Sequence, residues 1–183
     1  MTQISNLFDP SEVVLSTIHG SNLYGLNHAK SDTDLYLVLS DATGSTSPTQ
    51  IISGEHDHLI IGFSNFMKQV YKGVPQALEA FYSPKAEVDK LHALRSNYYC
   101  NSSKVVNTYL RTIKSFSLDD RHPTKYKKHA IRLAFNLNSI VTQGYFSPVL
   151  SEEQKTICHS VENLTSDEYY DTLILHSLIR PTF

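Results

Sequence analysis

The sequence predicts an α/β protein of the α+β kind, in which a small mixed β-sheet is followed by a helical C-terminal half. Short runs of β-branched and apolar residues gather in the first third of the 183-residue chain, as is typical of strands. Beyond them, apolar residues recur at helical spacing between residues that begin and end helices. We expect an α/β core over residues 1–95 and a helical region over residues 96–183, packed together as one compact unit.

Three strands are expected in the core. Residues 13–18 are apolar and β-branched, residues 34–40 are apolar on both faces and should therefore lie inside the sheet, and residues 57–61 alternate. The third of these strands begins at Asp57. Residues 41–54 are rich in Ser, Thr, Gly and Pro, which predicts a solvated loop.

Helices dominate the rest of the chain. Helix-start and helix-stop residues together with apolar spacing predict four of them, over residues 64–72, 76–82, about 98–116 and 125–143. In the third, the predicted inner stripe consists of Val106, Leu110, Ile113 and Phe116. Two capping boxes each begin a further helix, and they are Ser151 with Gln154 and Thr165 with Glu168.

Composition excludes several classes of protein. The formal charge is −2 and the isoelectric point about 6.5, so the chain is not a globally basic protein that wraps nucleic acid, and nucleic acid can bind only through a local basic patch. Cys100 and Cys158 are far apart and lack metal-site spacing, which indicates a reducing compartment. Because the sequence has neither a signal-peptide pattern nor an apolar run of membrane-spanning length, we expect a cytoplasmic protein with no membrane partner.

The strongest motif is a glycine-serine turn followed by paired carboxylates. Gly20-Ser21 follows the first predicted strand, and glycine lets backbone N–H groups approach a phosphate closely. Asp32 and Asp34 stand two residues apart at the next strand, so both point to one face and can share divalent cations. A phosphate cradle beside a metal site predicts phosphoryl or nucleotidyl chemistry. An isolated Asp-x-Asp pair is also common in solvated turns.

A later helix carries a candidate phosphate-binding face. Four residues fall at i, i+3, i+4 and i+7, which places them on one side of the helix, and they are Lys125, Lys128, His129 and Arg132. The same pattern also fits an ordinary solvated helix face.

Together these elements resemble the DNA polymerase β-type nucleotidyltransferase superfamily, whose signature joins a Gly-Ser turn to an Asp-x-Asp pair on the next strand. The fuller pattern, with Tyr24-Gly25 and Ser31, is similar to a subgroup of predicted nucleotidyltransferases that includes RNA-repair-associated members. Lys72-Gly73-Val74-Pro75, Leu78-Glu79 and the basic residues of 125–132 resemble further elements of that subgroup, in the same order. Glu79 is also placed to pair with Lys72 or Lys85 on structural grounds alone.

The resemblance implies a site for Mg²⁺, or Mn²⁺, held by Asp32, Asp34 and a third carboxylate on a neighbouring strand. For the third carboxylate we choose Asp57, with Glu55 as the alternative, and it would help to deprotonate the acceptor hydroxyl.

The resemblance also implies contacts to a nucleoside triphosphate. Ser21 and the Gly20-Ser21 backbone would contact its outer phosphates, and Tyr24 lies beside that turn as a candidate nucleotide contact. The basic helix face would add positive potential for the nucleotide or for nucleic acid.

Three functions fit these expectations. The first is a nucleotidyltransferase that moves a nucleoside monophosphate from NTP to a hydroxyl of nucleic acid, a protein or a small molecule. The second uses the same metals as a nicking or end-processing nuclease, for example in DNA or RNA repair. The third is a non-catalytic module that binds nucleic acid or a protein partner, because fold alone does not fix activity.

Overall fold

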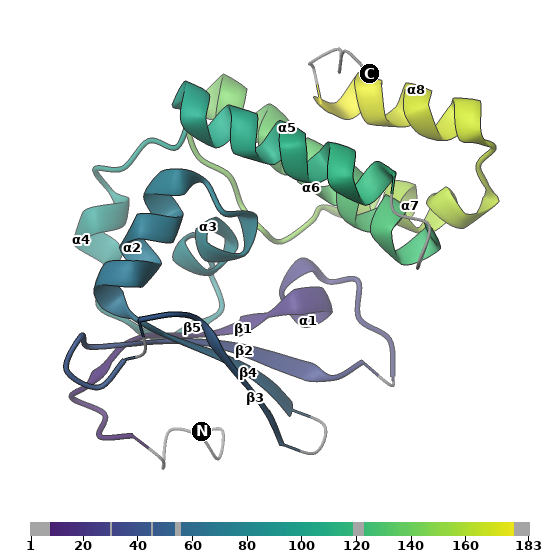
Figure 1. Cartoon of the computed structure of the whole chain (residues 1–183). Helices are drawn as coiled ribbons and strands as arrows, with labels where there is room; N and C mark the ends of the chain where they lie inside the picture. Colours follow the sequence, from purple (N-terminus) through teal and green to yellow (C-terminus); the bar gives the residue numbers. More distant parts are fainter. Residues whose placement is uncertain (1–7, 30, 45, 54–55, 119–122, 178–183) are drawn as a thin grey trace. The chain divides into compact units, whose positions relative to one another are not determined.

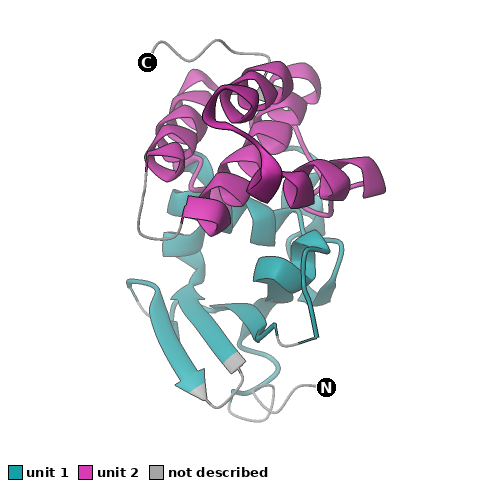
Figure 2. Ribbon diagram, turned by 90° about the vertical axis from the view of Figure 1, so that its right-hand side faces the viewer, with its two compact units in different colours: residues 1–71, 76–98 teal, residues 72–75, 99–183 magenta. Residues whose placement is uncertain are grey.

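The structure is a computed structural model, and it describes residues 8–29, 31–44, 46–53, 56–118 and 123–177. The chain divides into two compact units, residues 1–71 with 76–98 and residues 72–75 with 99–183, which are coloured separately in Figure 2. The first unit contains the β-sheet and the second is helical. The α+β class predicted from the sequence is confirmed.

The first unit is built on a five-stranded mixed sheet in the order β3-β4-β2-β1-β5 (Figure 1). β2 pairs in parallel with β4, and the other neighbouring pairs are antiparallel. β2 lies in the middle, as its unbroken apolar run predicts, and residues 35–39 are all buried. The five strands are β1 (Val13–His19), β2 (Thr33–Leu39), β3 (Thr49–Ser53), β4 (His56–Gly62) and β5 (Ala86–Asp89).

The prediction that residues 41–54 form only a loop is wrong, because β3 lies within them. β3 is an edge strand that pairs with β4, and its apolar residues Ile51 and Ile52 are 44% and 74% exposed. An edge strand is stabilised by hydrogen bonds to one neighbour and needs no buried face, so the alternation that marks other strands is missing. The sequence analysis also missed β5 and the short helix α4 (His92–Arg95).

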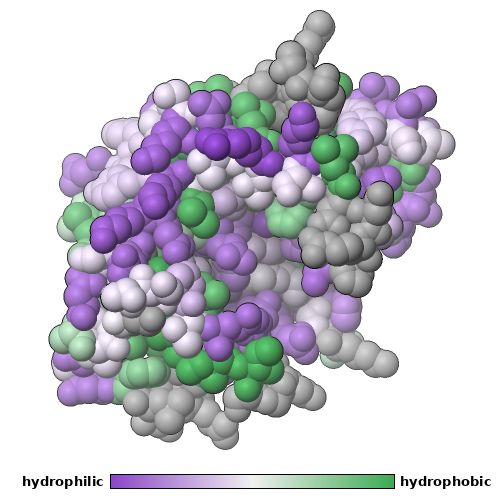
Figure 3. All heavy atoms as spheres, viewed as in Figure 1, coloured by the Kyte–Doolittle hydropathy of each residue, from purple (hydrophilic) through white to green (hydrophobic). Residues whose placement is uncertain are grey.

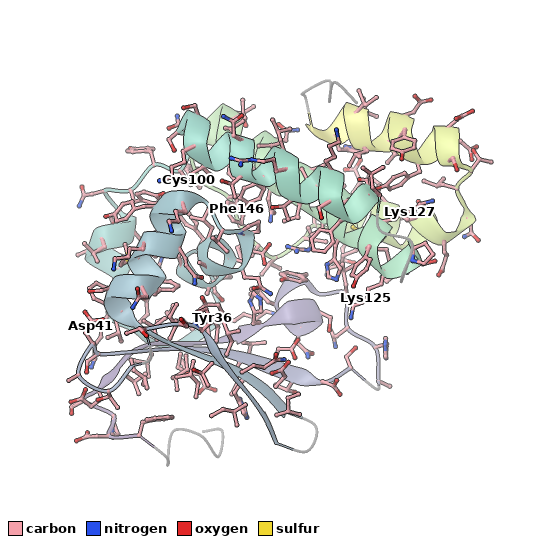
Figure 4. The ribbon with its side chains drawn as sticks, in the orientation of Figure 1. Tyr36, Asp41, Cys100, Lys125, Lys127 and Phe146 are labelled. Carbon is pink, nitrogen blue, oxygen red and sulfur yellow. The ribbon has the colours of Figure 1, made fainter. Side chains whose placement is uncertain are left out.

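Aromatic side chains connect the sheet of the first unit to helices α2 (Phe63–Lys72) and α3 (Pro75–Phe81). The ring of Tyr36 on β2, labelled in Figure 4, lies edge-on to Phe66 with centroids 5.7 Å apart, and Phe66 in turn contacts Phe81 at 6.4 Å. Both helices match their predicted spans to within one residue. The cap predicted at Ser64 is supplied instead by Asp41, whose Oδ1 accepts the Ser64 N–H at 2.8 Å.

The second unit contains α5 (Ser103–Ser117), α6 (Pro123–Gln143), α7 (Glu152–Ser160), the 3₁₀ turn η2 (Val161–Asn163) and α8 (Ser166–Ser177). Both predicted capping boxes are present, at the starts of α7 and α8. α6 packs against α5, α7 and α8, so all residues from 130 to 137 are buried.

The inner stripe predicted for α5 is confirmed at Ile113 and is wrong by one position at the other three residues. The residues buried on this helix are Val105, Tyr109, Ile113 and Ser117, whereas Val106, Leu110 and Phe116 are only partly buried. The reason is that the core face contains a tyrosine and a serine, whose hydroxyls a hydropathy pattern counts as polar. Ser117 Oγ lies 2.9 Å from the hydroxyl of Tyr169 on α8, so burial does not leave it unsatisfied.

Figure 3 shows a surface of mostly hydrophilic and intermediate side chains, with hydrophobic ones in small separate groups. In the described ranges, no helix combines the length and apolar character needed to cross a lipid bilayer.

Candidate functional site

Three neighbouring strands bring candidate side chains together around Asp34. Asp34 lies opposite His19 in the antiparallel pairing of β1 with β2, and opposite Asp57 in the parallel pairing of β2 with β4. Residues in register on paired strands point to the same face of a sheet, so the two carboxylates share one face. Asp57 therefore stands beside Asp34, as the choice of a carboxylate on a neighbouring strand requires.

Gly20 lies directly against the Asp34 carboxylate. It has φ of +65°, and a Cβ added there would stand 1.9 Å from Asp34 Oδ2. Any side chain at this position would collide with the carboxylate as well as strain the backbone. The absence of a side chain at Gly20 thus leaves space for the Asp34 carboxylate. This role is additional to the predicted close approach of the Gly20 backbone to a phosphate.

Asp57 holds one of its oxygens by a hydrogen bond and buries the other. Oδ2 accepts a hydrogen bond of 2.5 Å from Nε2 of Gln50 on β3, and Oδ1 is buried with no hydrogen-bond partner among the described residues. A buried carboxylate oxygen without a donor is costly unless an ion or another donor meets it. The alternative third carboxylate, Glu55, lies outside the described residues.

Asp32 is exposed and lies just before β2. Its backbone carbonyl accepts a hydrogen bond of 2.6 Å from Asn22 Nδ2, which ties the start of β2 to α1 (Gly20–Tyr24). Within the described residues, no three His, Cys, Asp or Glu side chains come close enough together to hold a metal ion. The structure therefore brings Asp34 and Asp57 side by side without gathering Asp32 into one cluster with both of them.

The predicted nucleotide contacts at the turn differ in their surroundings. Ser21 is partly exposed on α1, and its carbonyl accepts the N–H groups of Gly25 and Leu26, both at 3.0 Å. Tyr24 is only 3% exposed, and its hydroxyl donates a 2.6 Å hydrogen bond to Glu79 Oε2. In this structure the Tyr24 ring packs in the core and offers no open face to a nucleotide.

Glu79 is fully buried, and its Oε2 accepts the hydrogen bond from the hydroxyl of Tyr24. His19 joins the same group through its ring, which lies edge-on to Tyr24 at 6.1 Å and to Tyr36 at 5.6 Å between centroids. A buried acid on α3 is thereby connected through aromatic rings to the strand residue opposite Asp34.

Two contacts around this site were not predicted from the sequence. Gln50 holds Asp57, and Lys85 Nζ donates a 2.5 Å hydrogen bond to the carbonyl of Asn22 on α1. No pattern in the sequence marks Gln50 or Lys85, because their contacts depend on strand pairing and on the fold of the first unit.

The basic helix face predicted on α6 is divided between exposed and buried residues. Lys125 is exposed in the first turns of α6, where Figure 4 labels it, and Lys128 Nζ lies 3.5 Å from Glu162 Oε2. His129 packs its ring against Phe116 at 5.6 Å between centroids. Arg132 is only 4% exposed, so the prediction that all four share one surface face is wrong for Arg132.

Arg132 lies in the stretch of α6 from residue 130 to 137, which is buried throughout, and α6 contacts α5, α7 and α8. Periodicity identifies one side of a helix, but it does not show how many sides of that helix neighbouring elements cover.

Burial raises the pKa of the Cys158 thiol on α7 to about 11, although the charges of Arg132 and Lys128 act to lower this pKa. The α6 residues belong to the second unit, and their part in a nucleotide site stays a prediction.

The chain matches no known protein-family model, and no curated protein matches its sequence. The geometry around Asp34 and Asp57, together with the sequence motifs, therefore carries the functional argument.

Proposed function

We propose that this protein is a metal-dependent nucleotidyltransferase. It would join a hydroxyl oxygen of an acceptor to the α-phosphorus of a nucleoside triphosphate while the bond to the β-phosphate breaks and pyrophosphate leaves. The observation that carries the proposal is the pair Asp34 and Asp57, in register on parallel strands, with one oxygen of Asp57 buried and lacking a hydrogen-bond donor. The resemblance of the Gly20-Ser21 and Asp32-x-Asp34 motifs supports the same chemistry.

The residues present fit Mg²⁺ or Mn²⁺. Mg²⁺ is usually bound by one or two carboxylates together with substrate phosphates and several waters, so the pair Asp34 and Asp57 is a sufficient protein contribution. Asp32 lies just before the same strand and is not gathered with them into a group of three. When bound, such an ion would neutralise charge that develops on the phosphate oxygens.

The protein's own groups would take the following parts. Asp57 would accept the proton of the acceptor hydroxyl through Oδ1, the oxygen that receives no hydrogen bond, while Gln50 holds Oδ2. Gly20 would keep the Asp34 carboxylate in place by leaving the space beside it empty. Ser21 would contact the triphosphate.

The test is label transfer from each α-³²P-labelled NTP to short RNA, short DNA and protein acceptors in the presence of Mg²⁺. We expect transfer and pyrophosphate release, both lost in Asp34→Asn and Asp57→Asn. Asp41→Asn is a matched control, because Asp41 caps α2 and stands outside the site. Absence of transfer with every nucleotide and acceptor, in protein that binds Mn²⁺, would refute the proposal.

The same assay distinguishes the alternative activities. Cleavage of nicked or single-stranded nucleic acid without NTP, abolished by Asp34→Asn, would replace transfer with nuclease action at the same carboxylates. Binding of nucleic acid that survives both Asp substitutions without covalent change would identify a binding module.

A further inference from the structure

A groove of about 520 Å³ on the second unit is lined by positive charge. Its lining consists of Lys72, Val74, Lys104, Thr108, Arg111, Thr112 and Ser115. Three of these residues are cations and none is a carboxylate. None of these residues is among the candidates of the Asp34 site or of the α6 face.

Two segments form the groove and hold each other in place. One is the link of residues 72–75, and the other is the surface of α5. Thr108 Oγ1 donates to the carbonyl of Lys72 at 2.8 Å. Gly73 has φ of +76° and approaches so closely that an added Cβ would stand 2.6 Å from Val105 Cα. The groove is therefore fixed by main-chain contacts.

The positive charge of the groove is not offset by nearby acids of the same helix. α5 contains no Asp or Glu, and Lys72, Lys104 and Arg111 make no ion pair with any carboxylate that the structure describes. The described carboxylates of the second unit gather instead on α7, η2 and α8, and they are Glu152, Glu153, Glu162, Asp167, Glu168 and Asp171.

Charge is also divided between the two units. The first unit holds five of the 16 basic and ten of the 18 acidic residues, and the second holds eleven and eight, which gives formal charges of −5 and +3. An overall charge of −2 thus conceals a basic unit. Its electrostatic potential favours an anionic partner at the groove.

The spacing along α5 favours an extended polyanion over a single phosphate. Lys104 and Arg111 are seven residues apart, which is about 10 Å along a helix and exceeds the size of a single phosphate group. The volume lies in the range of small-ligand sites and is large enough for a nucleotide or two of a flexible strand.

From these observations we infer that the groove between residues 72–75 and α5 binds the backbone of single-stranded nucleic acid. The cations contact successive phosphates, and Val74 with the lysine stems provides an apolar floor for sugar or base. The inference does not depend on nucleotidyl transfer, since none of these residues belongs to the Asp34 site.

The test is fluorescence anisotropy with a labelled single-stranded RNA of about 12 nucleotides, over salt concentrations from about 50 to 200 mM. The decisive variant is Lys104→Gln with Arg111→Gln, and the matched control is Lys114→Gln, which removes a charge from the same helix outside the groove lining. All three substitutions change exposed side chains, so the fold should be retained, as circular dichroism will check.

We expect the double variant to weaken binding at least tenfold and to reduce the slope of log K against log salt by about 1.4, while Lys114→Gln changes the affinity less than twofold. Asp34→Asn should bind like the wild type, which separates this site from the proposed activity. Three outcomes would overturn the inference: equal losses in the double variant and the control, equal or tighter binding of a duplex of the same length, or stronger binding of polyglutamate or phosphatidylserine vesicles than of RNA.

Discussion

Replacing Asp57 by Asn should raise the free energy of unfolding when Mg²⁺ is absent. When Mg²⁺ is present, the variant should be less stable than the wild type. The substitution keeps the size of the side chain and its ability to accept the hydrogen bond from Gln50, but it removes the negative charge opposite Asp34. Neighbouring strands lie about 4.8 Å apart, which places the two carboxylates about 5 Å from each other.

At that distance, two like charges repel by about 1 kcal/mol in water and by about 3 kcal/mol at an effective dielectric constant of about 20. Like charges directly opposite on paired strands typically cost less than about 1 kcal/mol. In EDTA, Asp57→Asn should therefore raise the free energy of unfolding by about 1 kcal/mol. With Mg²⁺ at ten times its dissociation constant, the wild type should gain about 1.4 kcal/mol that the variant lacks.

Urea unfolding of both proteins, with EDTA or with Mg²⁺, measures these changes. Asp89→Asn is the control, because Asp89 accepts two hydrogen bonds from Arg95 at 2.7 and 3.0 Å on the edge strand β5. This variant should lose stability in both solutions and keep the Mg²⁺ response. The reasoning fails if Asp57→Asn destabilises the metal-free protein as Asp89→Asn does, or if it retains the full Mg²⁺ response.

Three more predictions concern the rest of the chain. Tyr24→Phe removes a donor from the buried Glu79 carboxylate, so urea unfolding should show a loss of about 1–3 kcal/mol, and an unchanged midpoint would contradict the importance of that bond. Hydrogen bonds from Arg95 hold the pKa of Asp89 below its ordinary 3.8, so this stabilisation is present above that pH and is lost as the pH falls through the lower pKa of the folded state. An acid titration of stability should therefore be flatter for Asp89→Asn than for the wild type, and parallel curves would count against the ion pair. Because burial raises the pKa of Cys158 to about 11, its alkylation by iodoacetamide at pH 8 should be slow in folded protein and fast in urea, as mass spectrometry of the labelled peptide would report.

The sequence predicted those parts of the fold where local pattern and tertiary packing agree. The central strand β2 has an apolar run whose residues 35–39 are all buried, and its neighbour β4 begins at His56, one residue before the predicted start at Asp57. Asp34 and Asp57 lie side by side because β4 pairs in parallel with β2, although β3 lies between these two strands in the sequence. Local pattern does not predict that pairing. Strand order and direction are properties of the whole sheet, and one chain's local pattern does not determine them.

Two errors show where local pattern fails. β3 contributes Gln50 to the site, but it is an edge strand in a segment whose Ser, Thr and Gly content resembles a loop. Arg132 stands at helical spacing from Lys125 and Lys128, but its side chain is buried. Both errors concern neighbours contributed by distant parts of the sequence.

The parallel pairing of β2 with β4 also limits how the sequence can vary in length. Side chains alternate along a strand, so one residue inserted within β2 or β4 would turn a carboxylate to the opposite face of the sheet. The segment between Leu39 and Thr49 joins two strands without setting their register, and extra residues there cost little in loop-closure entropy. Proteins that share this site should therefore differ in length between β2 and β3, and should keep the spacing from Asp34 to Leu39 and from Asp57 to Gly62.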